Sequence, residues 1–178
     1  DNNNKTSGGL LMTYAFNDRL NVGYSNYMGD DSPMGDTVSR TRFYNNVFIN
    51  YQSKKIKIQF GGDYAVQQKV DIEPAAMISG ILSVRYQCCK KTGIYVRGEY
   101  FNDPEGFLSG IFTDDNGYVT GLKILGVTAG AEYKPTDNSY IRLEGRMLQA
   151  DEGQSIFRWN QKNTNMRTEA MVHIGVSF

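Results

Sequence analysis

The segment EAMVHIGVSF, residues 169–178, alternates between an apolar and a more polar set of side chains. The apolar set consists of Ala170, Val172, Ile174, Val176 and Phe178. Successive side chains of a β-strand point to opposite faces of a sheet, so a period of two predicts a strand. The two faces of this strand must therefore meet different surroundings.

The same period of two recurs along the chain and predicts nine strands, with no convincing helical stripe. The predicted strands are residues 10–16, 20–29, 41–51, 56–68, 76–87, 92–102, 121–133, 139–148 and 167–178. A length of 178 residues fits one domain, residues 1–178, because domains usually span about 100 to 200 residues.

The connections between these strands alternate between two kinds. The short ones are NDR, QSKK, CCKK and KPTDN, and the intervening ones are mostly longer and rich in Asp, Asn and Gly. Short turns on one rim and long loops on the other are typical of outer-membrane barrels. The sequence therefore predicts an all-β fold, an antiparallel up-and-down transmembrane β-barrel.

Charge and hydropathy exclude several other classes of protein. The 19 basic and 19 acidic residues cancel, and no basic cluster suggests a nucleic-acid partner. Mean hydropathy is −0.47, and no apolar run approaches the roughly 20 residues that a membrane helix needs. A transmembrane strand needs only about 9 to 11 residues with every second one apolar, so low hydropathy is compatible with a barrel.

Aromatic residues favour a barrel over a soluble lectin-like sandwich, which alternation alone would permit. Phe16, Tyr51, Tyr86, Tyr133 and Phe178 lie on apolar faces at the short-turn ends of predicted strands. Amphipathic rings at one level suit the boundary between lipid and water, so these residues predict an interfacial girdle.

Two hairpins and the chain end resemble a known family. The segment GVTAGAEYKPTDNSYIRLEGRMLQAD (126–151) resembles the penultimate hairpin of the OmpL-like β-barrel porins of Gram-negative outer membranes, and GGLLMTYAFNDRLNVGYSNYMGDD (8–31) is similar to an earlier one. The closing VHIGVSF is similar to the signal that the barrel-assembly machinery recognises, carried by Val172, Ile174, Val176 and Phe178. The resemblance implies passive diffusion of small hydrophilic solutes. It brings no catalytic residues and no cofactor.

The odd number of predicted strands has a consequence for the barrel. Single-chain bacterial barrels usually have an even number of strands with both ends in the periplasm. Counting back from the last strand places Asp1 on the long-loop side. We therefore expect this chain to be the C-terminal part of a larger barrel.

Charged residues on the polar faces are the candidate site. Those predicted to line the lumen are Arg85, Arg97, Glu99, Arg142, Glu144 and Arg146. They could form a belt that sets ion preference, or a ladder of cross-strand ion pairs contributing about 0.2 to 1 kcal/mol each. The overall balance of charge predicts weak selectivity.

The remaining reactive residues suggest no other chemistry. Asp30, Asp31 and Asp36, and Asp114 with Asp115, are interpreted as solvated turn residues and not as a calcium site. Cys88 and Cys89 are either free thiols or linked to a part of the protein outside this chain. His173 stands alone, and no nucleophile, base and orienting group can be assembled, so we expect neither an enzyme nor a metal site.

The sequence therefore predicts a passive channel in the outer membrane of a Gram-negative bacterium. Its expected partners are outer-membrane lipid, the barrel-assembly machinery and other outer-membrane subunits, with no nucleic acid. A non-conducting barrel that acts as an anchor, an adhesin or a subunit of a surface complex remains the alternative. GFLSGIF at 106–112 would suit partner docking or a plug.

Overall fold

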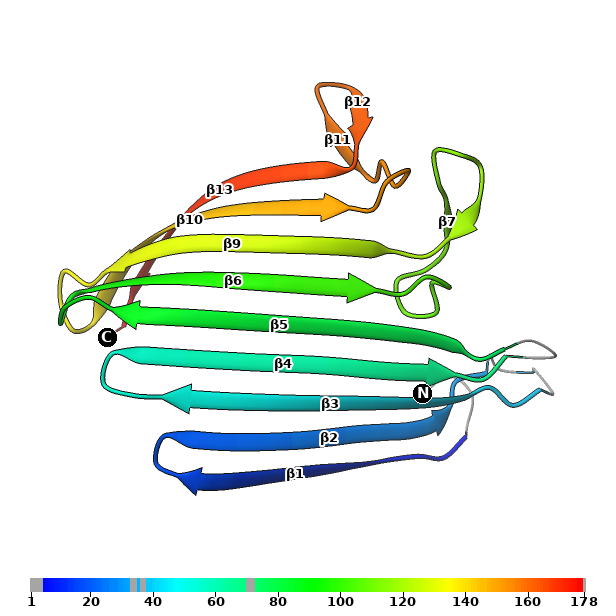
Figure 1. Ribbon diagram of the computed structural model, residues 1–178, viewed down its shortest axis with the longest axis horizontal. Coiled ribbons are helices and arrows are strands. Elements are labelled where there is room, and N and C mark those ends of the chain that lie inside the picture. The colour runs from blue at the N-terminus through cyan, green and yellow to red at the C-terminus, as the bar shows by residue number, and fades with distance from the viewer. Residues whose placement is uncertain (1–4, 33–34, 36–37, 70–72, 178) are drawn as a thin grey trace.

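A computed structural model describes residues 5–32, 35, 38–69 and 73–177. Nine antiparallel strands lie side by side in one sheet (Figure 1). These strands are β1 (Ser7–Asn17), β2 (Leu20–Asp30), β3 (Thr41–Gln52), β4 (Ile56–Gln67), β5 (Ala75–Gln87), β6 (Thr92–Asn102), β9 (Lys123–Tyr133), β10 (Ser139–Ala150) and β13 (Met166–Val176). The predicted nine strands and the all-β antiparallel class are confirmed.

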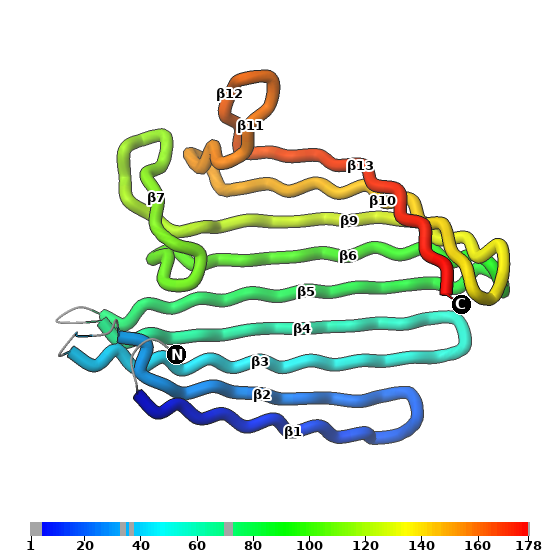
Figure 2. Tube along the Cα trace, turned by 180° about the vertical axis from the view of Figure 1, so that it is seen from behind, coloured from blue at the N-terminus to red at the C-terminus, as the bar shows by residue number. Residues whose placement is uncertain are grey.

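The strands follow one another in the sheet in chain order, each paired with its sequence neighbour. All four short turns lie at one end of the sheet and the longer connections at the other, as the views from both sides show (Figures 1 and 2). This order needs no crossover connection. The alternation of short and long connections that the sequence contains therefore reflects the two rims of the sheet.

Two small hairpins in the longest connections were not predicted. β7 (Phe112–Thr113) pairs with β8 (Val119–Thr120), and β11 (Phe157–Trp159) pairs with β12 (Lys162–Thr164). The second hairpin turns at Asn160 and Gln161, whose φ angles of 45° and 65° suit a two-residue turn. Strands this short contain too few side chains for a period of two to be recognised.

A buried carboxylate holds the first of these loops. Asp103 follows β6, is fully buried, and accepts hydrogen bonds from the backbone N–H groups of Phe107, Leu108 and Ser109. A second buried side chain, Gln154, joins the two loops because its amide contacts the backbone of Gly121 and Lys123. The connection between β6 and β9 is thus bonded to the connection between β10 and β13.

The sheet has two free edges. Within the described residues, β1 pairs only with β2, and β13 pairs only with β10 among the strands of the sheet. Residues of β1 are exposed along the full length of the strand. An unpaired edge presents a row of backbone N–H and C=O groups that need partners.

Very little of the apolar surface is buried. The accessible surface is 12207 Å² for a mass of 20.0 kDa, whereas a compact monomer of that size exposes about 8,700 Å². Among the described residues, the buried hydrophobic side chains are Ala65, Ala75, Met77 and Ala150. The described part of the chain offers no helix that could span a membrane. The sheet therefore has no conventional core.

Candidate functional site: a charged band on one face of the sheet

The two faces of the sheet differ sharply in chemistry. We call the face that carries Leu82, Val96 and Leu143 the outer face; these side chains are 50%, 49% and 57% exposed. Large apolar side chains continue along it on every strand, including Ile94 and Val176, and Val84 is half-buried beside them. The opposite, inner face carries almost all of the charged side chains of the strands. An exposed apolar surface this large marks contact with a membrane or with another protein.

The first cluster on the inner face joins three strands. Glu132 on β9 is 5% exposed and lies between Arg85 on β5 and Arg142 on β10. Its Oε1 is 2.5 Å from Arg85 Nη2, and its Oε2 is 2.8 Å from Arg142 Nη2. The Arg142 guanidinium also stacks against the rings of Tyr95 and Tyr140, at 5.6 Å and 5.3 Å from their centroids. Two cations share one carboxylate here.

A second cluster repeats this composition towards the long loops. Glu99 on β6 contacts Arg97 Nε at 2.7 Å and Arg146 Nη2 at 2.6 Å. Glu144, between the two clusters, accepts a hydrogen bond from the Tyr95 hydroxyl and lies 3.7 Å from His173 Nε2. Charge-assisted contacts of this kind order the side chains of a wall. The band as a whole is richer in arginine than in carboxylate.

Glycines on the inner face let these side chains reach past a neighbouring strand. Arg85 crosses β6 above Gly93, where an added Cβ would lie 2.9 Å from Arg85 Nη2. Glu99 meets Arg146 above Gly126, and Tyr95 meets Glu144 above Gly130. Each contact therefore joins strands that are two positions apart in the sheet. A larger side chain in any of the three gaps would occupy the path of the contact.

All six predicted charged residues project from the inner face. Arg85, Arg97, Glu99, Arg142, Glu144 and Arg146 lie in or beside the two clusters described above. Sequence reasoning missed Glu132, the most deeply buried carboxylate of the band. Its position on the charged side of β9 was visible in the alternation, but its pairing depends on Gly93 in another strand.

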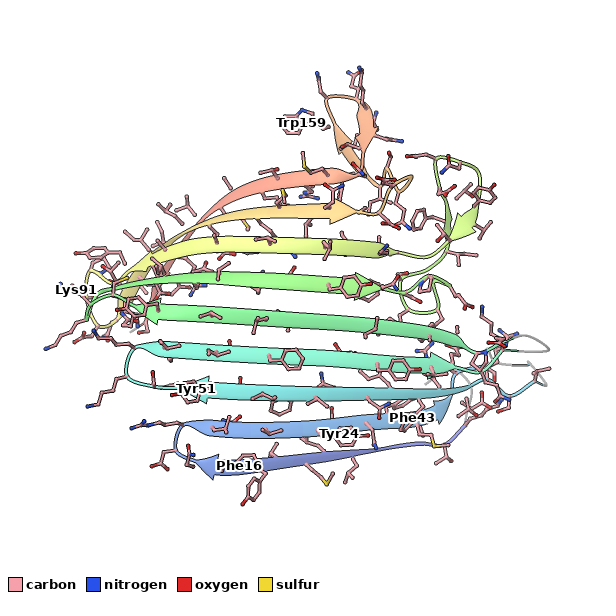
Figure 3. The ribbon with its side chains drawn as sticks, in the orientation of Figure 1. Phe16, Tyr24, Phe43, Tyr51, Lys91 and Trp159 are labelled. Carbon is pink, nitrogen blue, oxygen red and sulfur yellow. The ribbon has the colours of Figure 1, made fainter. Side chains whose placement is uncertain are left out.

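The predicted aromatic girdle lies on the outer face. Phe16, Tyr51, Tyr86 and Tyr133 are each the last or next-to-last residue of their strand at the short-turn end, and all are exposed. Figure 3 shows Phe16 and Tyr51 near this rim, while Phe43 lies towards the opposite rim. In the closing segment, Val172, Ile174 and Val176 are 65%, 73% and 60% exposed on the outer face of β13. Phe178 lies outside the described residues.

The inner face is the concave one. A cavity of about 700 Å³ at the short-turn rim is lined both by Asn21 of β2 and by Tyr140 of β10. Strands that far apart in sheet order can line one cavity only if the sheet curls with this face inside. A charged concave face and an apolar convex face are the arrangement of a water-filled barrel wall.

A family model described as "Putative beta-barrel porin-2, OmpL-like" matches residues 1–178. The chain belongs to this family. No curated protein matches the chain. Membership of the porin family identifies the curled sheet as barrel wall, which agrees with the resemblance that the two hairpins suggested.

The acidic segment at Asp114 and Asp115 of this porin-family chain serves as a turn. The Asp114 carboxylate accepts hydrogen bonds from the backbone N–H groups of Asn116 and Tyr118, and Asp115 accepts one from Ser155 Oγ. Across the described ranges, no group of three or more His, Cys, Asp or Glu side chains is arranged to hold a metal ion. Asp36 lies outside those ranges.

The vicinal cysteines give a prediction that tests the short-turn rim. Cys88 and Cys89 are exposed free thiols in the turn between β5 and β6. Hydrogen bonds, first from the Lys91 backbone N–H and then from Thr92, hold the pKa of the Cys89 thiol below its usual value, which is about 8.5.

We expect Cys89, studied in a Cys88→Ser variant, to react with iodoacetamide faster in the folded protein than in urea near neutral pH. The thiolate is the reactive form, and a lowered pKa keeps it populated as the pH falls. Above about pH 10 the Cys89 thiol is ionised in both the folded and the unfolded protein, so the ratio of the folded to the unfolded reaction rate should approach one. Equal rates at neutral pH would contradict the turn geometry.

Proposed function

We propose that this protein is an outer-membrane channel of a Gram-negative bacterium through which small hydrophilic solutes diffuse passively. The observation that carries the proposal is the division of one curled sheet into an exposed apolar outer face and an ion-paired inner face. Lipid acyl chains suit the first and water suits the second. Such a pore sorts solutes by its width and its lining charges, so it needs no catalytic residue or cofactor.

A closed wall is part of this proposal. A sheet edge within the hydrocarbon layer leaves backbone groups unsatisfied at a cost of several kcal/mol each. We therefore infer that β1 and β13 pair, in the membrane, with further strands that close the barrel. The total number of strands then sets the width of the lumen.

The predicted surface features fit into the same proposal. Tyr51, Tyr86 and Tyr133, with Phe16, would lie at the periplasmic lipid boundary, and the outer face of β13 would present the signal read by the barrel-assembly machinery. Arg85, Arg97, Glu99, Arg142, Glu144 and Arg146 would line the lumen. The two arginine-rich clusters support this role because water-facing charges are tolerated inside a barrel and not on its lipid side.

Conductance in planar lipid bilayers tests the proposed channel. The purified full-length protein should produce discrete current steps whose size scales with salt concentration and which persist without any energy source. A heat-denatured sample of the same preparation is the control. Persistent silence of a sample that is folded, as judged by its mobility in cold SDS gels, would contradict a channel.

The external hairpins favour one alternative, a non-conducting anchor or surface subunit. Tyr118, Val119 and Trp159 are 72%, 70% and 77% exposed, and Trp159 stands clear of the sheet on β11 (Figure 3). Exposed rings and apolar tips suit the binding of a partner outside the cell. A folded protein that conducts no current in planar bilayers would favour this alternative.

A further inference from the structure

The inner face has a continuous recess at its short-turn rim. The cavity of about 700 Å³ there shares Lys57, Gln59 and Arg85 with a second cavity of about 220 Å³, which extends to Arg97 and Arg142. Lys57 therefore stands where the two cavities join. A solute that enters the proposed lumen from this rim would pass this side chain.

Cationic side chains outnumber carboxylates around the larger cavity. Its lining includes Arg19, Lys57, Arg85 and Lys134 against the carboxylates of Asp18 and Glu132. Glu132 is already shared by Arg85 and Arg142. In the part of the chain that the structure describes, no carboxylate forms an ion pair with Arg19, Lys57 or Lys134. The recess thus has an excess of positive charge.

Strand pairing places two of these cations directly opposite each other. Lys57 on β4 is the cross-strand partner of Arg85 on β5, and both side chains lie on the inner face. Like charges at directly opposed positions repel each other. Arg85 turns away across Gly93 to reach Glu132, and Lys57 is left exposed beside Gln59. An anion between them would offset the repulsion.

Neutral hydrogen-bonding side chains complete the lining. Asn50, Gln59 and Gln87 contribute amide groups, and Tyr140 contributes a hydroxyl. Ammonium and guanidinium groups with nearby amides are the chemistry that binds carboxylates and phosphates. Cationic side chains around a lumen also favour anion passage.

We propose that the short-turn mouth holds a binding site for small oxyanions, centred on Lys57 with Arg19, Arg85 and Lys134 around it. This proposal rests on the proposed channel function, because the site lies on the inner wall of that channel. The site makes the channel prefer anions over cations. It also concentrates carboxylate- or phosphate-bearing solutes at the periplasmic end.

Two measurements on the reconstituted full-length protein test the site: the reversal potential of the channel and the block of its current by added oxyanions. Under a KCl gradient the wild-type channel should favour chloride, and Lys57→Glu should lower or reverse that preference. Inorganic phosphate and succinate are added separately from each side. From the short-turn side, either should reduce the current, with a half-blocking concentration that rises about tenfold in Lys57→Gln, as for the loss of one charged contact.

Lys54→Gln is the matched control. Lys54 is an exposed lysine in the turn before β4 and does not line the recess, so its removal should leave block and ion preference unchanged. A conducting channel that favours potassium, or equal block of both lysine variants, would overturn the anion site while the channel function stands.

A second measurement separates the two proposals if no current is seen. Equilibrium dialysis of radiolabelled phosphate against the detergent-solubilised protein should show binding that Lys57→Gln weakens about tenfold and Lys54→Gln leaves intact. Binding without conductance would reject the channel and keep the site. If the protein shows no phosphate binding and no block that depends on Lys57, the proposed site is rejected.

Discussion

A Val96→Arg variant will be less stable in the membrane than the natural protein by about 2 to 4 kcal/mol, the cost of an arginine near the bilayer midplane on the lipid side of a barrel. Val96 lies near the middle of β6, is 49% exposed on the outer face, and is opposed by Val84 and Ala129. The free energy of unfolding is measured by urea titration of the protein folded in lipid vesicles.

Gln59→Arg is the control for this variant. Gln59 is an exposed residue of β4 on the inner face, where an added arginine meets water. We expect its effect to stay within about 0.5 kcal/mol, the usual range for surface substitutions. If Gln59→Arg cost as much as Val96→Arg, or if Val96→Arg were neutral, the assignment of the two faces would be wrong.

Glu132→Ala should have the second largest effect, a loss of about 2 to 4 kcal/mol of unfolding free energy. The substitution removes a nearly buried carboxylate from between Arg85 and Arg142, whose side chains are 23% and 33% exposed. Removing one partner of a buried ionic contact leaves the other charges uncompensated, and this costs more than the contact itself contributes. The same urea titration measures the loss.

Two further experiments identify the cause of that loss. Glu152→Ala removes an exposed loop carboxylate and should change the stability by less than about 0.5 kcal/mol. In a double-mutant cycle, Arg85→Gln combined with Glu132→Gln should cost less than the sum of the single changes, since the two residues are in contact. Strictly additive losses would show that Glu132 stabilises the sheet through something other than its arginine partners.

The outline of the sheet was predictable because each long strand carries the alternation along its whole length. In β10, for example, Ile141, Leu143 and Met147 alternate with Arg142, Glu144 and Arg146, and the structure places these two sets on opposite faces. The alternation predicts the start of β9 at 121, two residues before its observed start at Lys123. There Gly121 belongs to the loop, where its backbone bonds to Pro104 and Gln154.

The sequence could not predict which charged residues contact each other within the band. Alternation assigns Arg85 to a face but does not say that it bypasses its direct neighbour Tyr95 and reaches Glu132 two strands away. That choice depends on the empty space above Gly93. A glycine on the charged side of one strand beside a long charged side chain on the next is the pattern that could have indicated it.

The contacts that pass above Gly126 and Gly130 also fix how β6 and β9 align. In the native alignment Glu99 is opposite Gly126 and Tyr95 is opposite Gly130. A slip of two residues would keep every side chain on its proper face. It would, however, place Thr128 opposite either Glu99 or Tyr95. The Glu99–Arg146 and Tyr95–Glu144 contacts would then both be lost. The connection from 103 to 122 is too long to dictate the alignment as a tight turn does. The two glycine gaps therefore act as a lock against mispairing at a junction of the wall where no tight turn sets the alignment.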